Sequence, residues 1–419
     1  LFNRHIMPKK ELYILTFFLL FNLEINALDN NDYVSTSSGK VQGYLENKVM
    51  NYDDIPYAKP PVGDLRWKAP REILDSERVI QNKDNNFCIQ EPSSMGGAPG
   101  EGILAGSEDC LYLDIKTPKK KSSELLPVMF WIHGGGNTSG LKDLYDYSTM
   151  VNRHDVIVVT INYRLGAFGW FTHPSIQGNH EGLDKASNFG TLDIIQALKW
   201  VNKNIELFGG DSNNITIFGE SAGGHNVLSL MVSPQAKGLF HKAISQSGYT
   251  TSASKGDAFA IDETHPTFNH TSNEVVKRLI NNHDSLSSED LYKRLLGLSA
   301  EEFFREYSDK SNLEVPLLTN DGIVIPLEGL EKALSKSSYV TDVPFMAGSN
   351  RDEVKLWIGT AEYFVKLDYS FFGSILGIPR VTLKDEDAFE AFNYYRSEAW
   401  KVRGVIEPIS SLNKVGSKN

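Results

Sequence analysis

Apolar residues beyond position 125 fall into short, continuous runs that alternate with longer amphipathic stretches. Residues 127–133 and 155–163 are short runs rich in β-branched side chains, which is typical of strands covered on both faces. Residues 191–209 instead carry apolar side chains at helical spacing and end on Gly209, a helix stop signal. This alternation predicts an α/β fold with a central, mostly parallel sheet flanked by helices.

The alternation continues toward residue 350 without an internal repeat or a long linker. Residues 214–218 form a further predicted strand, and residues 222–232 form a predicted helix. Residues 242–248 and 343–350 are candidate strands. Residues 273–306 are helical and charged, and we expect them to form an excursion over the sheet edge rather than a second domain.

The N-terminus follows a different pattern. From Met7, a basic pair (Lys9 and Lys10) precedes an apolar run at residues 12–21, and the small residue Ala27 marks a cleavage point. This layout predicts a secretory signal peptide over residues 7–27 and a secreted or extracytoplasmic protein. The alternative is a buried helix or strand of the folded domain.

The signal peptide sets the expected domain boundaries. Residues 1–6 precede the expected start methionine, and residues 28–419 form a single expected domain. An apolar run of ten residues is too short to cross a bilayer, so we expect no membrane span after signal removal.

Charge and cysteine content narrow the classes of partner. The 419 residues carry a formal net charge of -11, which argues against a nucleic-acid partner because phosphate binding requires clustered Lys and Arg. The two cysteines, Cys88 and Cys110, could form one disulfide in an oxidising compartment, and two buried free thiols are the alternative. No sequence feature sets an oligomeric state.

The stretch from Gly219 to Gly223 matches the G-x-S-x-G pattern of a serine nucleophile. In that pattern the serine occupies a tight turn between a strand and a helix, and the glycines allow the backbones to pack closely. A predicted strand leads into this segment and a predicted helix leads out of it. We therefore expect Ser221 to lie exposed at the N-terminus of the helix.

Three consecutive glycines follow the predicted strand that ends near His133. Because glycines are costly in backbone entropy, such a run needs a reason. An oxyanion hole supplies one, since its backbone N–H groups must approach a developing negative charge without side chains in the way. A plain flexible turn is the alternative.

Taken together, these motifs resemble the type-B carboxylesterase family, the branch of the α/β-hydrolases that includes the cholinesterases. The similarity covers about residues 35 to 355. The matching segments are 55–70 (IPYAKPPVGDLRWKAP), 107–115 (SEDCLYLDI), 133–137 (HGGGN), 161–170 (INYRLGAFGW), 188–211, 218–224 (FGESAGG), 243–248 (AISQSG) and 348–353 (GSNRDE).

The resemblance implies an α/β-hydrolase fold and a serine esterase that acts on small-molecule esters through an acyl-enzyme, with no cofactor and no metal. It implies Ser221 as nucleophile and Glu353 as the acid of the triad, with the more exposed Asp352 as the weaker candidate. The roles implied for the other residues are a disulfide between Cys88 and Cys110, oxyanion donors from Gly135, Gly136 and Ala222, a place beside the nucleophile for Glu220, and a buried polar network for Ser247.

The catalytic histidine that the resemblance implies is absent from its expected place. In this family the histidine follows the acid, but none of the ten histidines follows Glu353. His225 lies one helical turn after Ser221, but that spacing directs its ring away from the expected position of the acid. We therefore expect a C-terminally incomplete domain that lacks the final strand or two and the closing helix, and a chain that is inactive alone.

A non-catalytic binding or adhesion-type protein, or a short regulatory product, is the alternative function. No tryptophan lies between the two cysteines, which favours a broad-range carboxylesterase over a cholinesterase. Three sequons begin at Asn137, Asn214 and Asn269, and we expect glycosylation only at Asn269.

Overall fold

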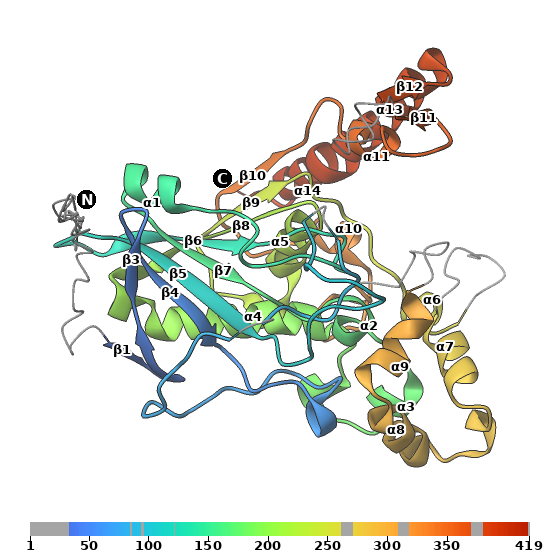
Figure 1. Cartoon of the computed structure of the whole chain (residues 1–419), viewed down its shortest axis with the longest axis horizontal. Helices are drawn as coiled ribbons and strands as arrows, with labels where there is room; N and C mark the ends of the chain where they lie inside the picture. The colour runs from blue at the N-terminus through green and yellow to red at the C-terminus, as the bar shows by residue number, and fades with distance from the viewer. Residues whose placement is uncertain are drawn as a thin grey trace, which may run out of the picture. The chain divides into compact units, whose positions relative to one another are not determined.

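The central sheet has eight strands in the order β10-β9-β8-β6-β7-β5-β4-β3 (Figure 1). The computed structural model describes residues 33–83, 86–93, 96–120, 122–260, 271–308, 318–369 and 380–417. The predicted signal peptide and Asn269 lie outside these residues. The strand bounds are Tyr44–Glu46 (β3), Val49–Pro56 (β4), Tyr112–Pro118 (β5), Leu126–Ile132 (β6), Ile157–Ile161 (β7), Gly210–Glu220 (β8), Lys242–Gln246 (β9) and Phe345–Gly348 (β10).

The sheet has a parallel part and an antiparallel part. Neighbouring strands are parallel from β10 through β9, β8 and β6 to β7. The pairs of β7 with β5, β5 with β4 and β4 with β3 are antiparallel. The parallel part contains all the strands predicted from the sequence, and their apolar side chains form the centre of the core, with Ile132, Val159 and Ile217 fully buried.

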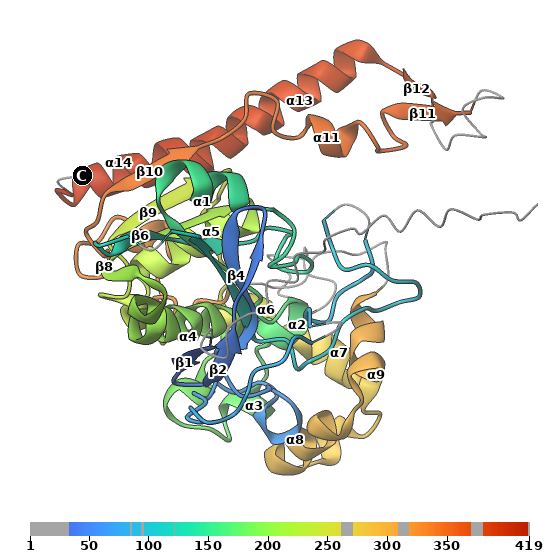
Figure 2. The ribbon, with the colours of Figure 1, turned by 60° about the vertical axis from the view of Figure 1, so that its left-hand side comes forward.

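Helices cover both faces of the sheet, which confirms the predicted α/β-hydrolase architecture. Figure 2 shows α4 (Phe189–Asn204) and α5 (Ala222–Val232) on one face and α1 (Ser148–His154) on the other. The bounds of α5 are those predicted from the sequence. Helix α4 continues as a 3-10 turn, and Gly209 then adopts a left-handed conformation with φ 85°, as its role as a stop signal predicts.

The predicted charged excursion consists of short helices that pack on the main core. Buried side chains of these helices, among them Val276, Leu295 and Phe303, belong to the same hydrophobic cluster as the sheet. The helices of the excursion are α7 (Ser272–Leu279), α8 (Ser288–Gly297) and α9 (Ala300–Phe304). The other described α-helices between β7 and β10, apart from α4 and α5, are α2 (Gly166–Gly169), α3 (Pro174–Gln177), α6 (Lys255–Phe259) and α10 (Leu330–Ala333).

Two hairpins and a C-terminal helical segment complete the described chain. Strands β1 (Tyr33–Thr36) and β2 (Gly39–Gln42) form one antiparallel pair, and β11 (Val365–Asp368) and β12 (Arg380–Leu383) form the other. After β10 come α11 (Lys355–Ile358), α13 (Glu386–Lys401), a π-helical turn (Val402–Ile406) and α14 (Glu407–Lys414). Within the described ranges, no helix has the length and apolar character needed to cross a membrane.

Candidate active site

Ser221 occupies a strained turn between β8 and α5. Its backbone has φ 56° and ψ -120°, a conformation that residues other than glycine rarely adopt. The flanking glycines make the turn possible. A Cβ at Gly223 would lie 2.0 Å from the Ile132 carbonyl oxygen, and a Cβ at Gly219 would lie 2.6 Å from the Gly223 carbonyl carbon. Only glycine fits at both positions, so the predicted elbow is present.

Main-chain hydrogen bonds hold this turn in place. The Ser221 N–H donates to the carbonyl oxygen of Gln246 at the end of β9, over 2.8 Å. The Ser221 carbonyl accepts the first bond of the helix from the His225 N–H, over 3.0 Å. The strained residue is therefore fixed on both sides, as a pre-organised nucleophile requires.

The glycine loop lies directly against the serine. A Cβ at Gly134 would lie 3.2 Å from the Ser221 Cβ and 2.9 Å from Glu220 Oε2. The next two glycines have left-handed φ values of 92° (Gly135) and 63° (Gly136). In the described structure, the N–H groups of Gly135, Gly136 and Ala222 donate to no protein acceptor. The three predicted oxyanion donors are therefore available to a ligand.

Asn137 anchors the glycine loop, a role that the sequence analysis did not assign. It is fully buried, and its side-chain oxygen accepts from Asn226 Nδ2 on α5 over 2.8 Å and from the Tyr163 hydroxyl over 3.3 Å. Its main-chain carbonyl accepts from the Gly166 N–H over 2.7 Å. The loop is thus tied to the helix that carries Ser221. This burial agrees with the expectation that the sequon at Asn137 is unoccupied.

The two candidate acids after β10 have different partners. Glu353 Oε2 accepts from the Asn350 N–H over 2.6 Å, within its own loop. Asp352 instead faces α13, where it accepts from Asn393 Nδ2 over 2.7 Å and pairs with Arg351. These two donors lower the pKa of Asp352. Both carboxylates are half-buried, so their partners distinguish them rather than their exposure.

Glu220 connects the serine to the acid loop. Burial raises the pKa of Glu220, and the negative charge of Glu353 raises it further. Asp352 is not among the causes of this shift. Of the two candidate acids, Glu353 is the one whose charge raises the pKa of Glu220, the residue before Ser221.

Ser247 is buried beside the acid loop. Its N–H donates to the Gly348 carbonyl over 2.7 Å, and its own carbonyl accepts from Trp400 Nε1 over 2.9 Å. The neighbouring Ser245 hydroxyl donates to the Gly224 carbonyl over 3.0 Å. These bonds join β9 to the acid loop and to α5, while the polar network predicted for the Ser247 side chain stays a prediction.

The histidines near the elbow are occupied elsewhere. His225 Nε2 bonds the Thr251 carbonyl over 2.7 Å, and its ring lies 4.0 Å from that of Tyr249. His133 bonds the Gly134 carbonyl through Nδ1 and stacks on Tyr163 at 4.4 Å. Burial lowers the pKa of His225 to about 3 and that of His133 to about 4, so both rings are neutral at pH 7. Among the described residues, no histidine ring bonds to the side chain of Ser221 or Glu353.

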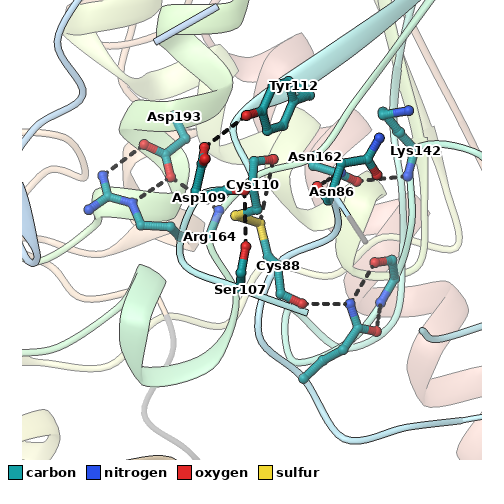
Figure 3. Close-up of a disulfide and its surroundings, with 12 residues drawn as sticks. Asn86, Cys88, Ser107, Asp109, Cys110, Tyr112, Lys142, Asn162, Arg164 and Asp193 are labelled. Carbon is teal, nitrogen blue, oxygen red and sulfur yellow. Dashed lines mark hydrogen bonds and ion pairs between the residues drawn. A yellow bond between two sulfur atoms is a disulfide. The ribbon is translucent and has the colours of Figure 1, made fainter. Parts of the chain in front are cut away.

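A disulfide joins Cys88 and Cys110, as the family resemblance implies (Figure 3). Beside it, the Tyr112 hydroxyl donates to the Asp109 carboxylate over 2.9 Å. Figure 3 also shows the buried ion pair of Arg164 and Asp193, in which Nε and Nη2 bond the two carboxylate oxygens over 2.7 Å each. The Tyr112–Asp109 bond ties the end of the disulfide loop to β5, while the ion pair joins Arg164 to α4.

A cavity of about 240 Å³ lies between the disulfide loop and the glycine loop. Its walls include Glu91 from the first loop, Thr138 and Ser139 from the second, and the aromatic ring of Phe168. A volume of this size can receive part of a small molecule, but its lining includes neither Ser221 nor the glycines with free N–H groups. Within the described ranges, no group of three or more His, Cys, Asp or Glu side chains is placed to hold a metal ion.

Comparison with families of known proteins gives one match over most of the chain. The model of the carboxylesterase family matches residues 30–376. The para-nitrobenzyl esterase of Bacillus subtilis is 37% identical over 329 residues, which cover 76% of this chain and 62% of that protein. The juvenile hormone esterase of Tribolium castaneum is 45% identical over 223 residues, covering 51% of this chain and 36% of that esterase.

Solved structures give the same result. A para-nitrobenzyl esterase structure superposes with a TM-score of 0.69 at 29% identity, covering 91% of this chain and 77% of that chain. The carboxylesterase EST55 of Geobacillus stearothermophilus superposes with a TM-score of 0.69 at 30% identity, covering 92% and 78%. The chain spans less than two thirds of the length of the curated relatives that it matches.

Proposed function

The chain belongs to the carboxylesterase family, and from this premise we propose that its site hydrolyses carboxylic esters through an acyl-enzyme on Ser221. The observation that carries the proposal is the placement of a strained serine against a glycine loop with free N–H groups at Gly135 and Gly136. Such donors stabilise the oxyanion of a tetrahedral intermediate.

The proposed reaction has an assigned nucleophile, oxyanion hole and acid, but no assigned general base. Ser221 Oγ attacks the ester carbonyl, and the N–H groups of Gly135, Gly136 and Ala222 hold the resulting oxyanion. Glu353 is the proposed acid that orients the base. Since no histidine of the printed sequence follows Glu353, the proposal assigns the base to no residue of this sequence.

A fluorophosphonate probe tests the nucleophile directly, because it reacts covalently with an activated serine. With imidazole added as the base, we expect labelling of the wild-type chain that is lost in Ser221→Ala and kept in Ser212→Ala, a control serine near the start of the same strand. Each reaction is run with and without added imidazole, which supplies a base from solution. Turnover of p-nitrophenyl esters, lost in the same variant, identifies hydrolysis.

The alternative is a binding protein that uses this fold without turnover. Absence of labelling in a folded wild-type chain, with and without imidazole, would support this second function. It would also contradict the assignment of Ser221 as an activated nucleophile.

We also propose that the protein is exported through a signal peptide over residues 7–27. The disulfide between Cys88 and Cys110 supports this, since disulfides persist in oxidising compartments. N-terminal sequencing of the expressed protein tests it: cleavage near Ala27 is the expected result, and an uncleaved intracellular chain is the contrary one.

A further inference from the structure

A second cavity lies apart from the glycine loop, between the segment that follows β9 and the C-terminal helical segment. Its volume is about 340 Å³. The residues that line it are Tyr249, Thr251, Arg396, Ala399, Trp400 and Arg403. None of them is a proposed nucleophile, acid or oxyanion donor.

Two aromatic rings form a fixed wall of this cavity. Tyr249 and Trp400 meet edge to face, with ring centroids 5.8 Å apart and an angle of 81° between the planes. Trp400 is held by the bond from Nε1 to the Ser247 carbonyl, and Tyr249 is held by its contact with the buried ring of His225. A flat apolar group can therefore pack on a wall that is already ordered.

Two arginines supply positive charge at the same cavity. Arg396 and Arg403 are seven residues apart, which places them on one face of the helical segment with Trp400 between them. Both are exposed. In the described part of the chain, neither arginine forms an ion pair or a side-chain hydrogen bond.

The neighbouring cations show that this lack of partners is local. Lys401, on the same helix, pairs with Glu398 over 2.9 Å, and Lys355 pairs with Glu390 over 2.8 Å. The chain as a whole has eleven more negative than positive charges, so acidic partners are plentiful. Two unpaired guanidinium groups beside a fixed aromatic wall are therefore complementary to an external anion.

We propose that this cavity binds a small aromatic carboxylate. The guanidinium groups of Arg396 and Arg403 bind the carboxylate, because the planar fork of arginine matches the two carboxylate oxygens. Tyr249 and Trp400 contact the ring of the ligand. The site shares no residue with the nucleophile, acid or oxyanion donors of the proposed ester hydrolysis.

Calorimetric titration of the whole chain with three naphthalene derivatives tests the proposal. The three probes are 1-naphthoate, the neutral 1-naphthamide and the cationic 1-naphthylmethylammonium, which share one ring system and differ in charge. We expect 1-naphthoate to bind at one site with a Kd below about 1 mM. We expect the neutral and cationic probes to bind at least about tenfold more weakly, and added salt to weaken the binding of 1-naphthoate.

Variants locate the site. Arg396→Gln and Arg403→Gln are each expected to weaken 1-naphthoate binding by about tenfold, and Trp400→Leu should weaken all three probes. Lys401→Gln is the matched control, because it removes a paired cation from the same helix, and it should leave binding unchanged. Ser221→Ala should also leave binding unchanged, which separates this test from that of the proposed function.

Three results would overturn the proposal. One is the absence of 1-naphthoate binding at about 10 mM, and another is equal binding of the neutral and the anionic probe. The third is wild-type affinity in the double variant of Arg396 and Arg403. Because both arginines are exposed, their replacement should not unfold the chain, and circular dichroism of each variant checks this.

Discussion

The segments around Ser221 pack on the main hydrophobic core, whereas those around Glu353 pack on a small, separate one. Ile132, Ile217 and Val227, which flank the glycine loop and the elbow, are fully buried members of the main cluster. Val354, next to Glu353, belongs to a second cluster whose other buried members are Ile358, Phe364, Val365 and Phe389. The proposed site is thus built on two hydrophobic clusters of different size.

The exposure of side chains also differs between these two parts of the molecule. Strand β9 carries buried residues at alternate positions, but its neighbour β10 has none, and Met346 on β10 is 64% exposed. Further large apolar side chains near the acid loop, such as Trp357, are exposed as well. Ser221 and the proposed oxyanion donors are therefore fixed by packing, while Glu353, the proposed acid, is positioned mainly by a hydrogen bond within its own loop.

The sharpest test of this difference compares one ion pair from each part. Asp193→Ala leaves Arg164 buried without its partner, which should lower the free energy of unfolding by about 3–5 kcal/mol. Glu390→Gln removes the partner of Lys355 at an exposed pair and should not change stability measurably. Urea denaturation with an unchanged m-value measures both. Equal effects of the two substitutions would contradict the comparison.

The second prediction concerns the close approach of backbones at the elbow. In Gly223→Ala the new methyl group would meet the Ile132 carbonyl oxygen, and we expect a loss of about 3 kcal/mol. Gly297→Ala is the control, because nothing lies within 4 Å of its Cβ position at the end of α8. The control should be neutral or stabilising by up to about 1 kcal/mol. A neutral Gly223→Ala would show that the strand and the elbow are not in contact as described.

The sequence predicted the parallel part of the fold well because that part follows local rules. The helix at 222–232 and the strands at 127–133 and 242–248 have continuous apolar patterns and clear glycine boundaries. The antiparallel strands β4 and β5 were not predicted as strands. Strand β4 contains two aspartates and an irregular register between Tyr52 and Ile55, so its pairing depends on contacts distant in the sequence.

The candidate site was predictable to a similar extent. Motifs alone indicated Ser221 and the run of three glycines, since the chemistry requires those residue types, and the family resemblance singled out Gly135 and Gly136 as donors. The role of Asn137 was missed, because its partner Asn226 is 89 residues away and only the fold brings the two together. The choice of Glu353 over Asp352 came from the family resemblance, and its physical support, the effect on Glu220, becomes visible only in the structure.

The third prediction uses the pH dependence of stability to probe the segments around Ser221. The segments around Glu353 contain no histidine, because none follows residue 283 in the sequence, so histidine titration does not report on them. Burial lowers the pKa values of His133 and His225 below the ordinary value of 6.5, so the unfolded chain binds protons more readily than the folded one as the pH falls. Each histidine should therefore cost about 2 kcal/mol of stability between pH 7 and pH 4.5.

Variants of single histidines measure this cost. His225→Phe should make the loss of stability toward acid smaller by about 2 kcal/mol, whatever its effect at pH 7. His154→Gln, a substitution at an exposed position, is the control for the mutation itself. Parallel pH profiles for wild type and His225→Phe would show that this ring is not buried in its neutral form.

The smallest expected effect is a titration shift that tests whether the two parts meet at one site. Burial and the charge of Glu353 together raise the pKa of Glu220, so Glu353→Gln should lower that pKa while burial still keeps it above the ordinary value. Asp352→Asn is the matched control, because Asp352 faces Asn393 on α13 and makes no contribution to the shift. Carbon-13 NMR of the glutamate carboxyl groups, assigned with Glu220→Gln, follows the titration. If Asp352→Asn moved the Glu220 pKa and Glu353→Gln did not, the assignment of the acid would pass to Asp352.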